Sequence, residues 1–199
     1  MQTWRLQRLA AEWNSRSLRE AGFSIDLGRL QSLVQQFTPL ISNAPDVTAL
    51  LTDEARLTKA LFRLAVEAVG YGEFTRAKRG TGTDAANRFL DHGNYLAYGL
   101  GATATWVLGL PHGLAVLHGK TRRGGLVFDA ADLIKDAAIL PQAFLSAMRG
   151  DDEQQFRRQC IEALTRSESL DFIIDTLKHI ASTTSRLADA PPPVREPNA

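Results

Sequence analysis

Apolar residues recur at intervals of three and four along most of this 199-residue chain, which is the spacing of one face of an α-helix. A helix of this kind buries its apolar face against its neighbours. The sequence therefore predicts a mainly α fold of about seven helices, with at most a small hairpin at 114–128. The expected helices cover residues 3–21, 26–41, 46–69, 94–108, 130–148, 152–166 and 168–187.

The length of the chain predicts one domain. Residues 1–187 carry the helical patterns, whereas residues 188–199 are rich in proline and are predicted to form a disordered tail. The formal net charge is +1, which excludes a global basic field, so any surface for nucleic acid has to be local.

Cysteine usage and hydropathy indicate the cellular compartment of the chain and whether it spans a membrane. The single cysteine, Cys160, excludes an internal disulfide framework and fits a reducing cytosol, so we expect a cytoplasmic protein. Its place in an apolar helical pattern predicts a buried structural thiol. The segment Tyr95–Leu117 is long enough to span a bilayer, but Gly109 and Pro111 interrupt it. We predict a core helix followed by a short strand or loop, with no membrane span.

The helix predicted at 46–69 has a carboxylate on its apolar face. Glu54 occupies the one position between Leu50 and Leu57 where the spacing of this face calls for an apolar residue. A charge there is costly to desolvate unless a partner compensates it. One interpretation is a pair with Arg56 or Thr58, or a side chain that reaches water near a frayed helix start. The other is a functional ligand. The apolar face consists of Leu50, Leu57, Leu61, Leu64 and Ala68.

The stretch Pro111–Asp136 brings several chemically active residue types together. An apolar run ends in His118, a basic turn follows, and a second apolar run leads to Asp129 and Asp132. If the two runs pair as a hairpin, His118 and Asp129 lie at the same end or one strand length apart. Alternatively, Asp129 is the N-cap of the next helix and Asp132 completes a capping box.

A neutral imidazole with two or three carboxylates suits Mg²⁺ or Mn²⁺ better than structural zinc. Lys120, Arg122 and Arg123 in the basic turn would then lie beside the ion and neutralise phosphates. The polar segment 70–92 is either a solvated loop or a second phosphate-contacting loop, and its cations are Arg76, Lys78, Arg79 and Arg88. The sequence contains no Gly-x-Ser-x-Gly motif, which disfavours covalent nucleophilic catalysis.

Four motifs together closely resemble the CRISPR-associated spacer-integration endonucleases, the Cas-one family, with the nearest likeness to the F subtype of type I systems. They are LTDEARLTK at 51–59, NYLAYG at 94–99, PHGLAVLH at 111–118 and LVFDAADLIKD at 126–136. The resemblance implies a metal-dependent DNA nuclease and integrase that inserts foreign DNA fragments into a CRISPR array.

The resemblance also implies the site and the partners. It places the ligands of Mg²⁺ or Mn²⁺ at Glu54, His118 and Asp132, with Asp129 beside them. The implied partners are double-stranded DNA fragments, the CRISPR repeat, a second copy of the chain, and the adaptation protein Cas-two, which is fused to the Cas-three helicase-nuclease in the F subtype. The family's catalytic domain is mainly helical and follows a β-rich N-terminal domain, for which this sequence shows no pattern. The chain is therefore interpreted as the catalytic half. The alternative function is a non-catalytic helical module that binds DNA or protein.

Overall fold

The computed structural model describes residues 1–78, 80–82, 84–114, 116–117 and 124–188. Within these ranges it contains helices and no strand, which confirms the predicted mainly α fold. The elements are α1 (Gln2–Trp13), α2 (Arg16–Glu20), α3 (Leu27–Ser42), α4 (Val47–Val69), α5 (Ala85–Val107), α6 (Gly125–Ile134), the π-helix η2 (Lys135–Ile139), α7 (Leu140–Arg149), α8 (Glu153–Arg166) and α9 (Ser169–Ala188).

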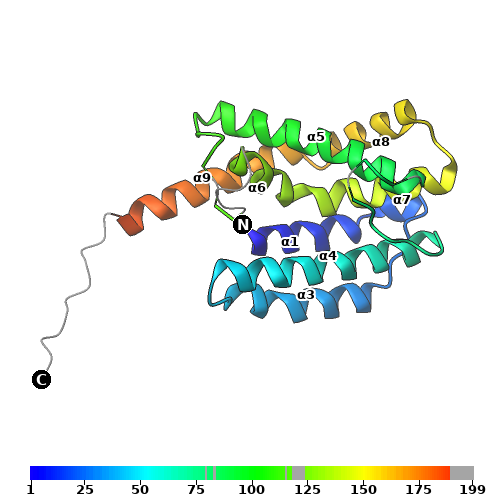
Figure 1. Cartoon of the computed structure of the whole chain (residues 1–199), viewed down its shortest axis with the longest axis horizontal. Coiled ribbons are helices and arrows are strands. Elements are labelled where there is room, and N and C mark those ends of the chain that lie inside the picture. Colours follow the sequence, from blue (N-terminus) through cyan, green and yellow to red (C-terminus); the bar gives the residue numbers. More distant parts are fainter. Residues whose placement is uncertain (79, 83, 115, 118–123, 189–199) are drawn as a thin grey trace, which may run out of the picture.

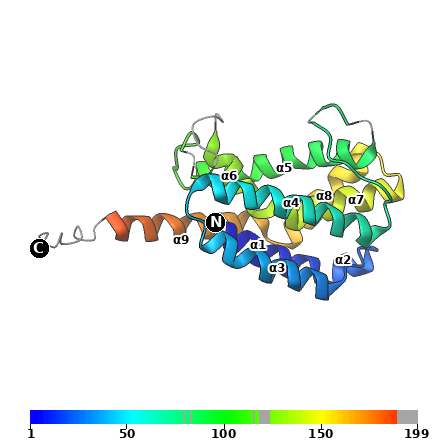
Figure 2. The same ribbon diagram turned by 60° about the horizontal axis from the view of Figure 1, so that its bottom comes forward.

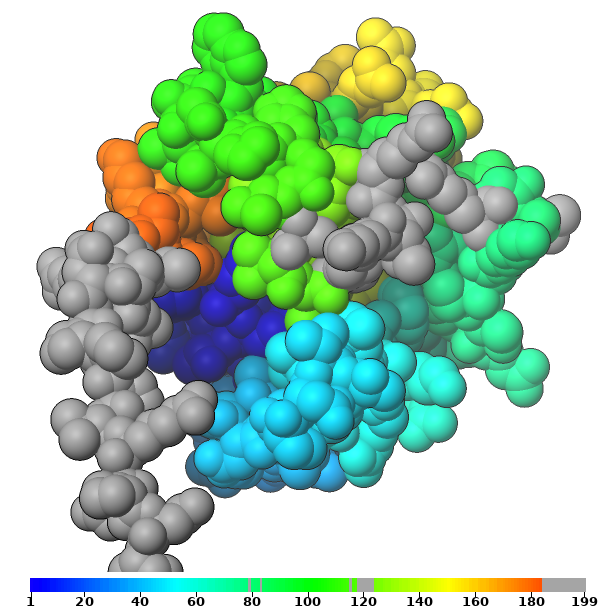
Figure 3. All heavy atoms as spheres, turned by 60° about the vertical axis from the view of Figure 1, so that its left-hand side comes forward, coloured from blue at the N-terminus to red at the C-terminus, as the bar shows by residue number. Residues whose placement is uncertain are grey.

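The consecutive elements α6, η2 and α7 run through the middle of the molecule (Figure 1). On one side they pack against α5, which also contacts α8 and α9. On the other side α1 packs on α6 and η2, and α3 and α4 pack on each other (Figure 2). Figure 3 shows part of α1 between α9 and the α3–α4 connection. The buried residues of all these helices form one continuous core.

The helix predicted at 94–108 is α5, which begins nine residues before its apolar pattern. It begins at Ala85 because the side chain of Asp84 accepts a hydrogen bond from the backbone N–H of Asn87 at 2.9 Å, which caps the first turn. Ala97 and Ala104 of this helix are fully buried. The predicted polar loop therefore ends at Asp84, and its last residues are helical.

One other expected helix was wrong in its extent, and one continues past a proline as predicted. The helix expected at 3–21 is divided into α1 and α2, because Ser15 lies in an extended conformation and accepts the N–H of Leu18 at 3.4 Å. The helix expected at 26–41 is α3, which continues through Pro39 to Ser42. A single proline removes one helical hydrogen bond, and here burial of Phe37 and Leu30 on the same helix keeps the segment helical.

The small hairpin expected at 114–128 is wrong in its second arm, since Leu126–Phe128 belongs to α6. A three-residue apolar run fits a strand or a helix equally well. Here Leu126, Ala130 and Leu133 are all buried, and their spacing of four and three is helical. The chain enters this helix through Gly124, whose φ of 78° is in the left-handed region.

A π-helical segment, η2, lies just before Pro141 within the stretch predicted as one helix at 130–148. Within η2 the N–H of Leu140 bonds the carbonyl of Lys135, five residues back. Pro141 then lies in the first turn of α7, where its missing N–H is tolerated. The wider turn therefore allows one long helical path to continue past a proline.

The remaining expectations concern the thiol, the membrane and the tail. Cys160 is fully buried as predicted, and this burial raises the pKa of its thiol to about 12. None of the helices in the described ranges is long and apolar enough to cross a membrane. Ala188 ends α9, and the rest of the predicted tail lies outside the described residues.

Gly101 allows α5 and α6 to pack closely. A Cβ atom there would lie 2.5 Å from the carbonyl oxygen of Val127 and 3.2 Å from the backbone N of Ala131. We predict that Gly101→Ala lowers the free energy of unfolding by about 1–3 kcal/mol, because the two backbones must separate. Gly99→Ala is the matched control on the same helix, since its Cβ would meet nothing within 4 Å. It should stabilise α5 by about 0.5–1 kcal/mol. Urea denaturation checks both values, and equal stabilities would contradict the prediction.

Candidate active site

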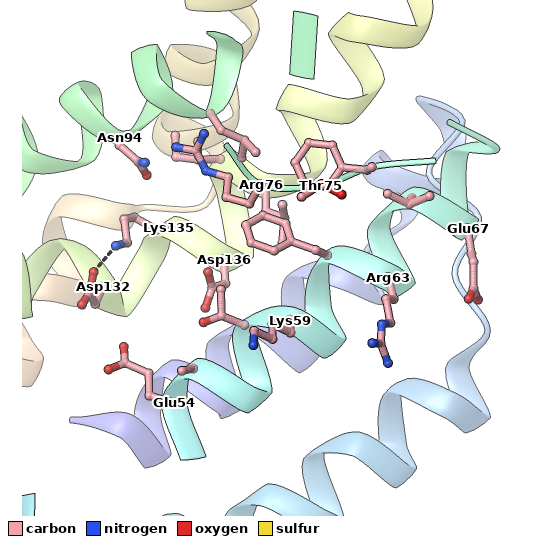
Figure 4. A pocket seen from close by; sticks show the side chains of 18 of the residues that line it. Glu54, Lys59, Arg63, Glu67, Thr75, Arg76, Asn94, Asp132, Lys135 and Asp136 are labelled. Atoms are coloured by element: carbon pink, nitrogen blue, oxygen red, sulfur yellow. Dashed lines mark ion pairs between the residues drawn. The ribbon is translucent and has the colours of Figure 1, made fainter. Parts of the chain in front are cut away.

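A cleft of about 1110 Å³ lies between α4, the segment 72–76, α5 and η2. Figure 4 shows Glu54 on α4 and, facing it, Asp132, Lys135 and Asp136. Residues from distant parts of the sequence thus line one cavity. The predicted ligands Glu54 and Asp132 are both among them.

The partner of Glu54 is Arg5 of α1, which the sequence analysis did not single out. The Arg5 side chain is 4% exposed, and its Nη1 donates to Oε1 of Glu54 and, at 3.1 Å, to Oε1 of Gln2. Its Nε donates to Oδ2 of Asp136 at 2.7 Å, and its Nη2 donates to the same oxygen. The expected pairing of Glu54 with Arg56 is wrong, because Arg56 donates to Oδ1 of Asp53 at 2.9 Å.

Electrostatics keep Arg5 charged in this buried place. Burial by itself disfavours the charged guanidinium, but attraction to Asp136, Glu54 and Asp132 outweighs it and raises the pKa of Arg5 above its ordinary value. A buried charge is tolerated when it is paired and hydrogen-bonded. Arg5 meets this condition with partners on both α4 and η2.

Asp132 forms an ion pair with Lys135, one turn further along the chain. The Lys135 ammonium also lies 5.9 Å from the centre of the Tyr98 ring. Burial opposes its charge, but the neighbouring Asp132 more than compensates and raises the pKa of Lys135. Asp132 is buried and Lys135 is half-buried in the wall of the cleft. Lys135 offsets the charge of Asp132, and Arg5 offsets one of the two charges of Glu54 and Asp136.

Asp129 holds the backbone of the preceding segment. Its Oδ2 accepts hydrogen bonds from the N–H groups of Val116 and Leu117 at 2.8 and 2.9 Å. The helix-cap interpretation of Asp129 and Asp132 is wrong, because α6 begins at Gly125, one turn earlier. Both aspartates lie inside the helix and are buried.

The cationic loops predicted to contact DNA fall only partly within the described residues. His118, Arg79, Lys120, Arg122 and Arg123 lie outside the described residues.

Arg76 is held by the protein itself, since it donates to Asn87 at 2.7 Å and pairs with Asp91 of α5. Lys78 and Arg88 are exposed and do not line the cleft. The cations that line it and make no ion pair within the described ranges are Lys59 and Arg63 of α4, which the sequence analysis missed. Their spacing of four on the helix of Glu54 was the available signal.

The donor chemistry of the cleft fits a hard divalent cation. Carboxylate oxygens are the ligands that Mg²⁺ and Mn²⁺ prefer, and Glu54 and Asp132 supply them from two facing elements. Among the described residues no group of three histidine, cysteine or acidic side chains is close enough to hold a metal. His118, the third ligand that the sequence predicts, lies outside the described residues.

Comparisons with known proteins agree with the motif resemblance. No protein-family model matches the chain. A CRISPR-associated endonuclease Cas1 from Pseudomonas aeruginosa is 64% identical over 182 residues, which are 91% of this chain and 56% of that protein. The corresponding protein from Pectobacterium atrosepticum is 58% identical over 92% of this chain and 56% of its own length. The chain belongs to the Cas1 family. Both relatives fit the predicted likeness to the F subtype.

This Cas1-family chain spans about half the length of these two curated relatives. Its fold resembles that of the crystal structure of a TtCas1–DNA complex, with a TM-score of 0.64 over 88% of this chain and 64% of the other. TtCas1 crystallised by itself gives a TM-score of 0.58 over 86% and 63%. The identity in both cases is 21%, so this likeness concerns the fold.

The bonds from Asp129 give a prediction about the segment before α6. We expect Asp129→Ala to accelerate hydrogen exchange of the Val116 and Leu117 amides roughly tenfold or more, since a hydrogen bond to a charged group contributes about 1.5–3 kcal/mol. Exchange measured by NMR checks this. Asp175→Ala on α9, which removes an exposed acid paired with Lys178, should leave both amides unchanged. Unaltered exchange in Asp129→Ala would show that the carboxylate does not hold this segment.

Proposed function

We propose that this chain carries the catalytic site of a metal-dependent DNA endonuclease and integrase that inserts DNA spacers into a CRISPR array. The observation that carries the proposal is that Glu54 and Asp132 line one cleft although they are far apart in the sequence. The high identity to two CRISPR-associated endonucleases supports the same reaction class.

Glu54, Asp132 and His118 are the proposed ligands of Mg²⁺ or Mn²⁺. When bound, such an ion polarises a phosphoryl oxygen and activates a hydroxyl nucleophile. Asp129 keeps the segment that leads to His118 against α6. Lys135, in the wall of the cleft, is suited to neutralise charge that develops on a phosphate.

In strand transfer, the 3′-hydroxyl of one DNA attacks a phosphodiester of another. A new oxygen–phosphorus bond forms while the bond to the leaving 3′-oxygen breaks, and that oxygen takes up a proton. In cleavage, water replaces the attacking hydroxyl. The residues of this chain bind and orient the phosphate in both reactions.

Cations at the cleft contact the DNA backbone in this proposal. Lys59 and Arg63 are exposed, lie one helical turn apart and line the cavity that contains Glu54. The basic turn with Lys120, Arg122 and Arg123 is proposed to contribute further contacts. The related fold of TtCas1 in complex with DNA supports a DNA substrate.

The proposed partners are double-stranded DNA fragments, the CRISPR repeat, a second copy of the chain, and the adaptation protein Cas-two fused to Cas-three. These assignments rest on family membership. They apply to the whole protein that the relatives represent.

Loss of any proposed ligand should abolish the reaction. We expect Glu54→Ala, His118→Ala and Asp132→Ala each to remove Mn²⁺-dependent DNA cleavage and strand transfer. Asp53→Asn is the control. Asp53 directly precedes Glu54 on α4 but pairs with Arg56 and does not line the cleft. It should keep wild-type activity. Activity that survives all three alanine changes would contradict the assignment.

DNA binding without metal tests the role of the cleft cations separately. In EDTA we expect Lys59→Gln and Arg63→Gln each to weaken binding of a DNA duplex and to reduce the slope of log K against log salt by roughly 1, as one phosphate contact is lost. Arg158→Gln on α8 is the control, since Arg158 is exposed and lies outside the cleft. Fluorescence anisotropy at several salt concentrations gives the slopes. Equal slopes in all variants would exclude this DNA path.

A non-catalytic helical module that binds DNA or protein is the second candidate. The observation that favours it is that Arg5 and Lys135 already pair with the carboxylates of the cleft. A folded chain that binds DNA but takes up no Mn²⁺ in calorimetry would support this module over the nuclease.

A further inference from the structure

Arg5 binds one oxygen of each of two carboxylates, those of Glu54 and Asp136. Its three donor atoms reach Oε1 of Glu54 and Oδ2 of Asp136. Within the described residues, Oε2 of Glu54 and Oδ1 of Asp136 accept no hydrogen bond. Both side chains line the cleft. Glu54 is therefore shared between a fixed internal cation and the cavity in front of it.

The bonds of Arg5 are divided unequally. Asp136 receives donors from both Nε and Nη2, whereas Glu54 receives one from Nη1. If the single bond to Glu54 is broken, the guanidinium keeps its two bonds to Asp136 and its charge stays compensated in the buried site. Asp136 can therefore keep the guanidinium of Arg5 paired when Glu54 binds another cation.

We propose that Arg5 is a built-in counter-cation that competes with the divalent metal for Glu54 and so sets the metal affinity of the site. Asp136 holds the guanidinium when Glu54 turns to the metal, and does not itself bind the ion. This inference rests on the proposed metal-dependent function. It assigns roles to two residues outside the predicted ligand set.

The physical reason is charge. Arg5, Glu54 and Asp136 together carry one positive and two negative charges, hence a net charge of −1. A divalent cation beside Glu54 is repelled by the guanidinium at short range, and this repulsion is strong where burial lowers the effective dielectric constant. Without metal, the same guanidinium offsets the repulsion between the Glu54 and Asp136 carboxylates.

Four versions of the full 199-residue chain test this, with Mn²⁺ affinity measured by calorimetry. Arg5→Gln gives the three positions a net charge of −2, Asp136→Asn gives 0, and the double variant returns to −1, as in the wild type. We expect Arg5→Gln to bind Mn²⁺ at least tenfold more tightly than the wild type and Asp136→Asn at least tenfold more weakly. The double variant should lie within a few-fold of the wild type. Arg8→Gln, on the same helix and paired with Glu12, is the matched control and should not change the affinity.

Stability provides a second measurement. Arg5→Gln should unfold at a lower temperature in EDTA than the wild type, and Mn²⁺ should raise its midpoint more, because a tighter ligand stabilises the folded state more. If Arg5→Gln does not fold, Asp136→Asn and the double variant still decide, since Asp136→Asn keeps Arg5 paired with Glu54.

Three results would overturn the inference. Weaker binding in a folded Arg5→Gln would show that Arg5 assembles the site instead of competing for it. A double variant that binds as weakly as Asp136→Asn would make Asp136 a ligand. Unchanged Mn²⁺ binding in Glu54→Gln and Asp132→Asn would also contradict the proposed metal site. If these two variants lose Mn²⁺ binding but the affinities of Arg5→Gln, wild type and Asp136→Asn do not fall in the expected order, only the role of Arg5 is overturned.

Discussion

The buried guanidinium of Arg5 connects three parts of the chain that are far apart in sequence. It ties α1 to Glu54 on α4 and to Asp136 in η2. A buried charge of this kind is stable when every donor is satisfied, and removal of one partner leaves the other uncompensated. Trp13, at the other end of α1, donates its indole N–H to the carbonyl oxygen of Asp136 at 2.9 Å. The position of α1 and the geometry of the cleft therefore depend on each other.

Close packing against α5 determines the position of α6, the helix that carries Asp129 and Asp132. Gly101 allows the backbone of α6 to approach, and Gly93 leaves room for Ile139 of η2. Asp129 and Asp132 stand between these two points of contact, so small residues on a neighbouring helix position the carboxylates. A π-helical turn follows directly, as it often does at functional sites. Rigid packing of this kind suits a reaction in which the protein mainly orients a phosphate.

The cleft combines three kinds of charge with different roles. Glu54 and Asp132 supply oxygen donors, and Arg5 and Lys135 compensate them from within the protein. Lys59 and Arg63 are exposed at the cavity and form no ion pair with the part of the chain that the structure describes. A phosphodiester substrate needs cations for its backbone and an acidic centre for a metal. Membership of the Cas1 family gives this arrangement its most direct interpretation.

The sequence by itself determined the helical class, most helix positions, the burial of Cys160, and Glu54 and Asp132 as residues that need an explanation. These follow from local periodicity and from the cost of placing a charge on an apolar face. Only the tertiary structure decided that Arg5 is the partner of Glu54, that Asp129 bonds the backbone before α6, and that Leu126–Phe128 is helical. Short apolar runs fit two conformations, and partners of buried charges are brought together by helix packing between distant segments. Neither is encoded in local spacing.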